Sequence, residues 1–267
     1  FLPQCLTLCA SCCVCFCRNR AQLQMQVQDL RVAVLCFEEH VFGRLIVKEM
    51  LRVGIVPRVV IQEPGKLAER RVGKYVQFTP PESLPGTFAE LLEGQDCEIV
   101  YVENSNDEAA EEALRRHNLD LLVLGGARII KPNILSIPKS GVLNLHPGLL
   151  PKMRGSMPTI WSIVYDYPQG VSCHFVDEDL DTGNLLKRVE CPVYRGQTYP
   201  QVFHSVNQLS AEVIVSVLVD YCTNGGHLEA TPQPPCEDGW CNNWPEDKVF
   251  EEAERKLREQ TYACFAD

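Results

Sequence analysis

The sequence predicts an α/β protein with a Rossmann-like, mostly parallel sheet and helices on both faces. The first observation is that short apolar runs alternate with helical segments between residues 31 and 146, as in a doubly wound sheet. The second is that two polar residues, Asn144 and His146, end the last of these apolar runs. Because ligands of such sheets lie beyond the carboxyl ends of the strands, these residues mark the candidate site.

The first three elements form a βαβ unit. Residues 31–36 are a short apolar run that predicts a buried strand, and residues 57–61 predict a second strand. Between them, residues 43–53 have apolar side chains at helical spacing and end at Gly54, a residue suited to the turn after a helix. A strand–helix–strand unit implies parallel strands with a right-handed crossover.

The chain is irregular for a stretch before the alternation resumes. Residues 63–95 are rich in proline and have no strong period, which predicts a loop-rich excursion with one short helix near residues 88–92. A strand over residues 98–102 follows. Asn106 is expected to cap the next helix, whose first turn is acidic and whose last turn is basic, as the helix dipole favours. Residues 119–124 predict another buried strand.

The remaining elements complete the sheet and cover it. Pro132 suits the first turn of a short helix, and residues 141–145 predict the strand that leads into His146. The later elements are predicted as a helix at 156–165, strands at 171–175 and 184–193, a long helix at 198–221 and a charged helix near 246–260.

The chain is acidic, with 25 Lys and Arg against 35 Asp and Glu and a net charge of −10. This charge argues against broad binding to phosphate backbones, and it leaves room for a local basic patch. The apolar fraction of 45% and the charged fraction of 22% are ordinary for a globular protein, so general disorder is not expected.

Six of the fourteen cysteines lie within the first 17 residues, which is not the distribution of a disulfide framework. Three interpretations of this apolar leader stay open: a misplaced start site, a targeting or anchoring segment, or a metal site. The leader is short for a membrane span and lacks a second Cys pair at zinc-finger spacing. We expect no metal, membrane contact only through residues 1–17, and a cytoplasmic location, or an organellar one if residues 1–30 are a targeting segment.

An amide, an imidazole and a carboxylate are the candidate chemical groups of the site. Asn144 and His146 end a strand, and Asp181 follows 35 positions after His146 in an acidic loop. An amide and a protonated imidazole can stabilise a developing oxyanion, and a carboxylate can take the proton from an attacking amine. This set of groups suits transfer of an acyl or formyl group to an amine.

These residues resemble the motifs of the folate-dependent formyltransferases. That family includes glycinamide ribonucleotide, methionyl-tRNA and nucleotide-sugar N-formyltransferases, and the hydrolase domain of 10-formyltetrahydrofolate dehydrogenase. It shares an Asn-x-His strand end, a following Leu-Leu-Pro and a Leu-Asp-x-Gly loop, which residues 144–146, 149–151 and 180–183 match in order. The resemblance covers roughly residues 31–233. It implies the formyltransferase fold, with Asn144, His146 and Asp181 as catalytic residues.

The resemblance also implies a formyl donor, 10-formyltetrahydrofolate, as a cosubstrate. Two neighbouring isoleucines offer an apolar wall and an acidic loop offers peptide groups, and both suit a flat heterocycle. His174 and Arg154 are candidates for binding the acceptor. The candidate donor-binding residues are Arg128, Ile129, Ile130, Asp177, Asp179 and Gly183.

The expected acceptor is an amino sugar or another small amine. Glycinamide ribonucleotide enzymes carry a Gly- and Ser-rich phosphate loop after the first strand, whereas residues 37–43 hold two acids and one Gly. Arg154-Gly155 followed by Pro158 resembles the methionyl-tRNA and sugar branch. The acidic charge counts against tRNA. Methionyl-tRNA enzymes usually add a C-terminal barrel domain and a basic tRNA-binding surface, whereas residues 237–267 have nine acidic and four basic side chains.

Three alternatives stay open: a methionyl-tRNA formyltransferase, a 10-formyltetrahydrofolate hydrolase that uses the same three residues, and a degenerate folate-binding protein. The predicted organisation is a leader and tether at 1–30, a formyltransferase domain at 31–233, and an acidic tail with a helix at 234–267. Residues 240–245 of that tail either cover the acceptor pocket or only pack on the domain.

Overall fold

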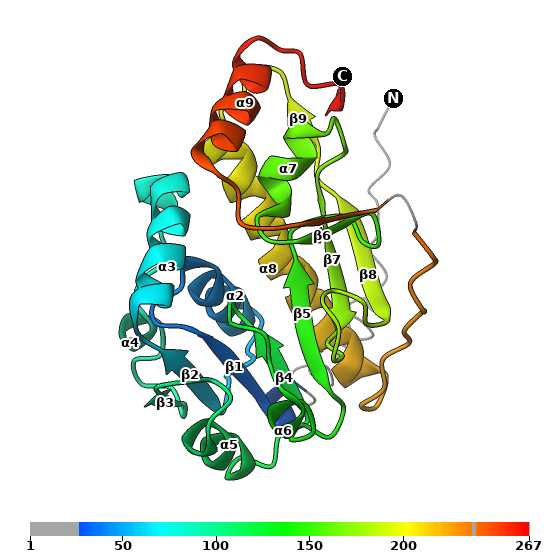
Figure 1. Cartoon of the computed structure of the whole chain (residues 1–267). Helices are drawn as coiled ribbons and strands as arrows, with labels where there is room; N and C mark the ends of the chain where they lie inside the picture. Colours follow the sequence, from blue (N-terminus) through cyan, green and yellow to red (C-terminus); the bar gives the residue numbers. More distant parts are fainter. Residues whose placement is uncertain (1–26, 237–238, 267) are drawn as a thin grey trace, which may run out of the picture.

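A seven-stranded sheet forms the centre of the computed structural model, which describes residues 27–236 and 239–266 (Figure 1). The strand order is β3-β2-β1-β4-β5-β7-β8. The first five strands in this order are parallel, and β7 and β8 pair antiparallel, which confirms the mostly parallel sheet. The strands are β1 (Val32–Phe37), β2 (Val59–Glu63), β3 (Glu98–Tyr101), β4 (Leu121–Leu124), β5 (Val142–His146), β7 (Gly170–Phe175) and β8 (Leu185–Glu190).

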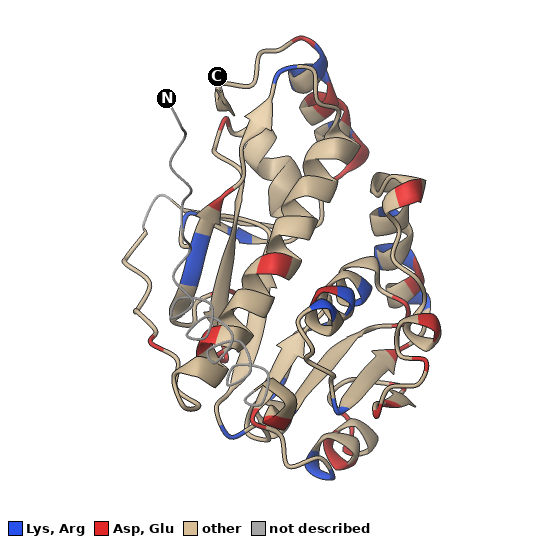
Figure 2. Ribbon diagram, turned by 180° about the vertical axis from the view of Figure 1, so that it is seen from behind, with Lys and Arg blue, Asp and Glu red and all other residues tan. Residues whose placement is uncertain are grey.

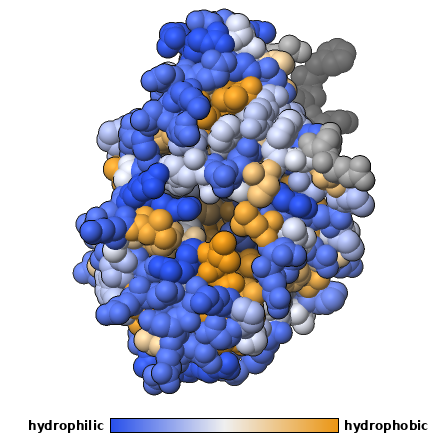
Figure 3. Space-filling view, viewed as in Figure 1, coloured by the Kyte–Doolittle hydropathy of each residue, from blue (hydrophilic) through white to orange (hydrophobic). Residues whose placement is uncertain are grey.

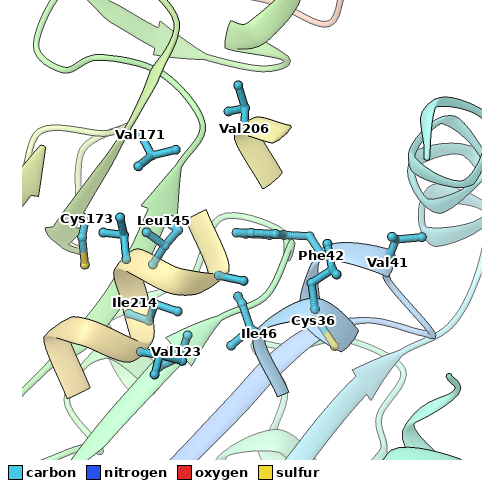
Figure 4. Close-up of a cluster of buried hydrophobic side chains, with 14 of the residues drawn as sticks. Cys36, Val41, Phe42, Ile46, Val123, Leu145, Val171, Cys173, Val206 and Ile214 are labelled. Atoms are coloured by element: carbon cyan, nitrogen blue, oxygen red, sulfur yellow. The ribbon is translucent and has the colours of Figure 1, made fainter. Parts of the chain in front are cut away.

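Helices cover both faces of the sheet. Helices α2 (Val41–Arg52) and α8 (Tyr199–Thr223) pack on one face, and α5 (Glu108–Arg115) and α6 (Pro132–Leu135) cover the other. The side chains of β1 alternate between the two hydrophobic clusters, as expected for a strand buried on both faces. Figure 4 shows the first cluster, where side chains of α2, the strands and α8 converge.

Helix α8 is the one helix of the described residues that is long and apolar enough to cross a membrane by length and composition. Its apolar stripe, however, lies against the sheet and α2 within the hydrophobic cluster, and 61% of its most apolar window is buried. That burial is typical of a core helix.

The C-terminal residues pack on the same body. Helix α9 (Asp247–Arg258), in the region where the sequence predicts a charged helix, lies beside α7 (Pro158–Val164) and buries Val249, Phe250 and Leu257. Two small parallel sheets were not predicted. One joins β10 (Trp240–Asn242) to β6 (Met153–Gly155), and the other joins β11 (Phe265–Ala266) to β9 (Val193–Tyr194).

The prediction for residues 63–95 is wrong in one respect, because this region holds a second helix. Helix α3 (Lys66–Phe78) comes before a short 3-10 turn, η1 (Pro81–Ser83), and the predicted short helix, α4 (Phe88–Leu91). Only Ala68 and Phe78 of α3 are buried, and Gly73 lies in its middle. Its apolar side consists of few and mostly half-exposed residues, and the glycine in its middle weakens the helical signal.

The predicted cap of α5 is also wrong, by one residue. The Asp107 side chain, not that of Asn106, accepts the bond from the Ala110 N–H, at 2.9 Å. Asn106 instead bonds to the backbone of Ile129 and Lys131, at 3.0 and 2.7 Å. It therefore holds the segment that follows β4.

The predicted strand at 184–193 is divided into β8 and β9, with Pro192 between them. Proline has no N–H to donate to a ladder, and the ladder between β8 and β7 ends at Glu190, before Pro192. The apolar leader predicted at residues 1–17 lies outside the described residues.

His40 is buried at the N-terminus of α2 and makes stability sensitive to acid. Its Nδ1 accepts from the Phe42 N–H, and its ring packs 4.4 Å from the ring of Tyr75. Burial, with smaller effects from Arg71 and Arg44, lowers the pKa of His40 from 6.5 to about 3. Below pH 6.5 the unfolded chain therefore binds a proton that the folded chain does not, and stability falls with pH down to about 3.

We expect the free energy of unfolding to fall by about 2 kcal/mol between pH 7 and pH 5 because of His40 alone. Urea unfolding at the two pH values measures this loss. His40→Asn, which keeps an acceptor at the cap, serves as the comparison and should remove most of the difference. Equal losses in the wild type and in His40→Asn would contradict this role for His40.

Candidate active site

The site is built at the carboxyl end of β5. Because side chains alternate along a strand, Asn144 and His146 point to the same side, and antiparallel β7 places His174 directly opposite Asn144. His146 is buried, and its Nε2 donates to the Met153 carbonyl at 2.8 Å. A carbonyl only accepts, so this bond fixes the proton on Nε2 and turns Nδ1 toward the loop that follows β7.

Asp181 reaches the same point from that loop. Its Oδ2 lies 3.5 Å from His146 Nδ1, and its Oδ1 lies 3.7 Å from His174 Nε2. The backbone N–H of Gly155 also donates to Oδ2, at 2.9 Å. The Asp181 side chain is 8% exposed, so the structure brings the three predicted catalytic residues together in a largely buried cluster.

The His146 and Asp181 side chains are oriented toward each other. With Nε2–H bonded to the Met153 carbonyl, His146 Nδ1 faces the Asp181 carboxylate at 3.5 Å. The pair can therefore hold one proton close to a reacting group, which is what general acid–base catalysis needs.

His174, a candidate for acceptor binding, lies inside the cluster. Its Nδ1 donates to the Phe175 carbonyl at 2.7 Å, so its Nε2 is free to accept from the Asn144 amide at 3.2 Å. Burial lowers the pKa of His174 below its usual range and favours this neutral form, while Asp181 acts in the opposite direction. His174 thus orients the Asn144 amide nitrogen, whose second hydrogen stays available.

Sequence reasoning missed Ser172, which is fully buried on β7. Its hydroxyl donates to the Gly148 carbonyl at 2.8 Å and accepts from the Leu150 N–H at 3.0 Å. These bonds hold the turn that follows His146. The signal was weak, because Ser172 is one polar residue in an alternating strand.

Residues 128–130 are the first segment predicted to bind the formyl donor, and Ile129 is the residue of this segment that is presented to solvent. Its side chain is 72% exposed, whereas that of Ile130 is buried. The Arg128 guanidinium forms a two-pronged ion pair with the buried Glu63 carboxylate. That side chain is therefore engaged within the protein, and the backbone of the segment remains available to a ligand.

The second segment predicted to bind the formyl donor is the loop from Asp177 to Gly183. Asp177 accepts from the Thr182 hydroxyl at 2.7 Å and closes the loop, while Asp179 is exposed. Leu180 is 47% exposed and, with Ile129, adds apolar surface to the two donor segments. The face shown in Figure 3 is hollowed near its centre, with apolar surface around the hollow.

Arg154, the other candidate for acceptor binding, donates to Gln233 Oε1 at 3.2 Å. Its backbone belongs to β6, next to the Gly155 N–H that holds Asp181.

Within residues 27–236 and 239–266, no group of three or more His, Cys, Asp or Glu side chains could hold a metal ion.

The sheet brings together an amide and an imidazole from β5 and a carboxylate from the loop after β7. These groups are suited to a protein that catalyses group transfer. Residues 30–218 match the family model described as formyl transferase. The chain therefore belongs to the formyl transferase family, as its motifs suggest.

Individual relatives agree with this assignment. The methionyl-tRNA formyltransferase of Bacteroides thetaiotaomicron is 28% identical over 170 residues, which are 63% of this chain and 49% of that protein. The chain spans about half the length of the curated relatives it matches.

Solved structures share the fold. A phosphoribosylglycinamide formyltransferase of Anaplasma phagocytophilum has a TM-score of 0.57 at 20% identity, covering 81% of this chain and all of that one. A formyltransferase of Anoxybacillus kamchatkensis has a TM-score of 0.50 at 21% identity, covering 77% and 94% of the two chains. The latter structure contains UDP-4,6-dideoxy-4-formamido-L-AltNAc and tetrahydrofolate.

Proposed function

We propose that this protein transfers a formyl group from 10-formyltetrahydrofolate to a primary amine. The observation that carries the proposal is that Asn144, His146 and Asp181 meet at the carboxyl end of β5. His146 and Asp181 are buried there, with 3.5 Å between Nδ1 and Oδ2, and Asn144 is half-buried. The bound tetrahydrofolate of the Anoxybacillus structure supports the donor class. The exposed apolar side chain of Ile129 offers a surface for the flat ring of such a donor.

In this mechanism the amine lone pair forms a bond to the formyl carbon, and the carbonyl electrons move onto the oxygen. The Asn144 amide donates to that oxyanion, and a protonated His146, whose two ring nitrogens face Met153 and Asp181, contributes through its positive charge. Asp181 takes a proton from the amine nitrogen, directly or through water. When the oxyanion collapses, the bond from carbon to the N10 nitrogen of the donor breaks, and a proton returns to that nitrogen.

We propose an amino sugar or another small amine as the acceptor. The end of β1 and the loop after it support this choice over glycinamide ribonucleotide, since most of the N–H groups there are already bonded within the protein and are not available to a phosphate. The bonded pairs are Phe37 N with Gly126 O, Glu38 N with Glu63 O, Glu39 N with Gln62 Oε1, and Phe42 N with His40 Nδ1. The UDP-linked formamido sugar in the Anoxybacillus structure is the kind of compound that formylation of an amino sugar would yield.

Methionyl-tRNA is the second candidate acceptor, because the curated relatives carry that name. The charge of the chain counts against it: 35 acidic residues outnumber 25 basic ones. In the view of Figure 2, Lys and Arg lie interspersed with Asp and Glu rather than gathered on one broad face.

The test follows tetrahydrofolate release from 10-formyltetrahydrofolate by the purified full chain. The reaction is run with water alone, with a panel of UDP-linked amino sugars, and with methionyl-tRNA. We expect release to depend on an amino sugar. Equal release with water alone would indicate a hydrolase, release only with methionyl-tRNA would indicate the tRNA enzyme, and folate binding without release would indicate a degenerate protein.

A further inference from the structure

A glutamine from far along the chain holds the loop that carries Asp181. Thr231 forms two backbone bonds with Leu185 at the start of β8, at 2.8 and 2.9 Å, and so brings Gln233 beside the loop. The Gln233 Nε2 donates to the carbonyls of Asp181 and Gly183, at 2.8 Å each. Since both partners are carbonyls, the nitrogen of the amide must face the loop.

The other end of the Gln233 amide connects the loop to β6. Its Oε1 accepts from Arg154, and the neighbouring Gly155 N–H donates to the Asp181 carboxylate. The carbonyl of Met153, in the same three-residue strand, accepts from His146. Strand β6 therefore fixes both members of the catalytic pair.

Strand β6 is held in turn by β10. The Trp240 N–H donates to the Lys152 carbonyl at 2.7 Å, and the Ser156 N–H donates to the Asn242 carbonyl at 2.8 Å. Gly155 has a φ of +94°, and a Cβ there would lie 2.2 Å from the Asn242 oxygen, so only glycine permits this approach. The residues after α8, beyond the segment matched by the family model, thus support the site.

We infer that Gln233 is a positioning residue, which holds the Asp181 carboxylate at its distance from His146 by bonding to the peptide groups on both sides of Thr182. Asp181 has a φ of +55°, a left-handed conformation that non-glycine residues seldom adopt and that the bonds from Gln233 help to hold. The inference rests on the proposed function for its activity measurement only.

The test compares Gln233→Ala and the isosteric Gln233→Glu with the wild type. The matched control is Gln208→Ala, because the bonds of the Gln208 amide among the described residues go to Glu49 and Glu212, away from the Asp181 loop. We expect kcat for tetrahydrofolate release to fall about 10- to 100-fold in both Gln233 variants, since small misplacements of a catalytic group have costs of this order. Gln233→Glu is no better than Gln233→Ala, because its carboxylate would face two carbonyl oxygens. The control keeps wild-type kcat.

A double variant shows whether Gln233 acts through Asp181. In an Asp181→Asn background, adding Gln233→Ala should lower kcat no further, because the group that Gln233 positions is already lost. A full additional fall of 10- to 100-fold in that background would overturn the inference.

Hydrogen–deuterium exchange supplies a measurement that needs no substrate. In Gln233→Ala we expect faster exchange in peptides that cover residues 175–185, and unchanged exchange in α2 and α8. If the wild type releases no tetrahydrofolate under any condition, the proposed function fails and this measurement still decides the role of Gln233. Unchanged exchange at residues 175–185 would overturn it.

Discussion

Asp181→Asn is expected to lower kcat for formyl transfer by about 10²- to 10⁴-fold, the range that a general base contributes. Asparagine has almost the same size and can still accept from the Gly155 N–H, so the main change is the loss of the charge beside His146. Without that charge, nothing takes the proton from the amine, and the imidazolium loses its partner. The effect should fall on kcat, with the melting temperature close to that of the wild type.

Two further variants and a control complete this experiment. Asn144→Ala and His146→Ala should each lower kcat by about 10²- to 10³-fold, because each removes a group that stabilises the oxyanion. Glu178→Gln removes an exposed charge from the same loop and should leave kcat unchanged. If Asp181→Asn retains wild-type kcat, or if Glu178→Gln loses as much as Asp181→Asn, the assignment of Asp181 is wrong.

Local patterns in the sequence are enough to predict most of the sheet. The strands that became β1, β4 and β5 are short apolar runs buried on both faces, and such runs are recognisable without any knowledge of their partners. The same logic locates the catalytic residues, because strand ends of a parallel sheet gather at one edge. Asn144 and His146 end the strand that the sequence predicts there, and Asp181 is identified by the Leu-Asp-x-Gly motif that follows.

The contacts that orient the catalytic groups were beyond such reasoning. The orientation of Asn144 depends on His174, which lies opposite it only because β7 turns antiparallel. The position of Asp181 depends on Gln233, which is 52 residues away in sequence. Pairings of this kind arise from the tertiary fold, and a single sequence carries no signal for them.

The same limit explains the missed helix α3. Its residues gain stability from a few contacts, chiefly those of Tyr75 and Phe78 with the aromatic rings of α8. A helix is predicted from the spacing of apolar residues within its own segment, and most positions of α3 are exposed. Tertiary packing therefore decides the helix where local periodicity does not.

Gly183→Ala is expected to displace the loop that carries Asp181. A Cβ at residue 183 would lie 1.8 Å from the Phe175 carbonyl oxygen and 2.8 Å from its carbon, so it meets the backbone of β7 rather than a movable side chain. The loop must shift, which breaks the bond from Gln233 to the Gly183 carbonyl and displaces Asp181. We expect kcat to fall about 100-fold and the free energy of unfolding to fall by about 1–3 kcal/mol.

Gly73→Ala is the matched control for this change. Gly73 lies in the middle of α3, and nothing lies within 4 Å of a Cβ built there. Alanine should stabilise that helix by about 0.5–1 kcal/mol and leave kcat unchanged. Urea unfolding and tetrahydrofolate release, measured on both variants, separate the loss of the loop from a general effect of adding a methyl group. A Gly183→Ala protein with wild-type kcat would show that the loop tolerates the displacement. The position of Asp181 would then not depend on the close approach of Gly183 to β7.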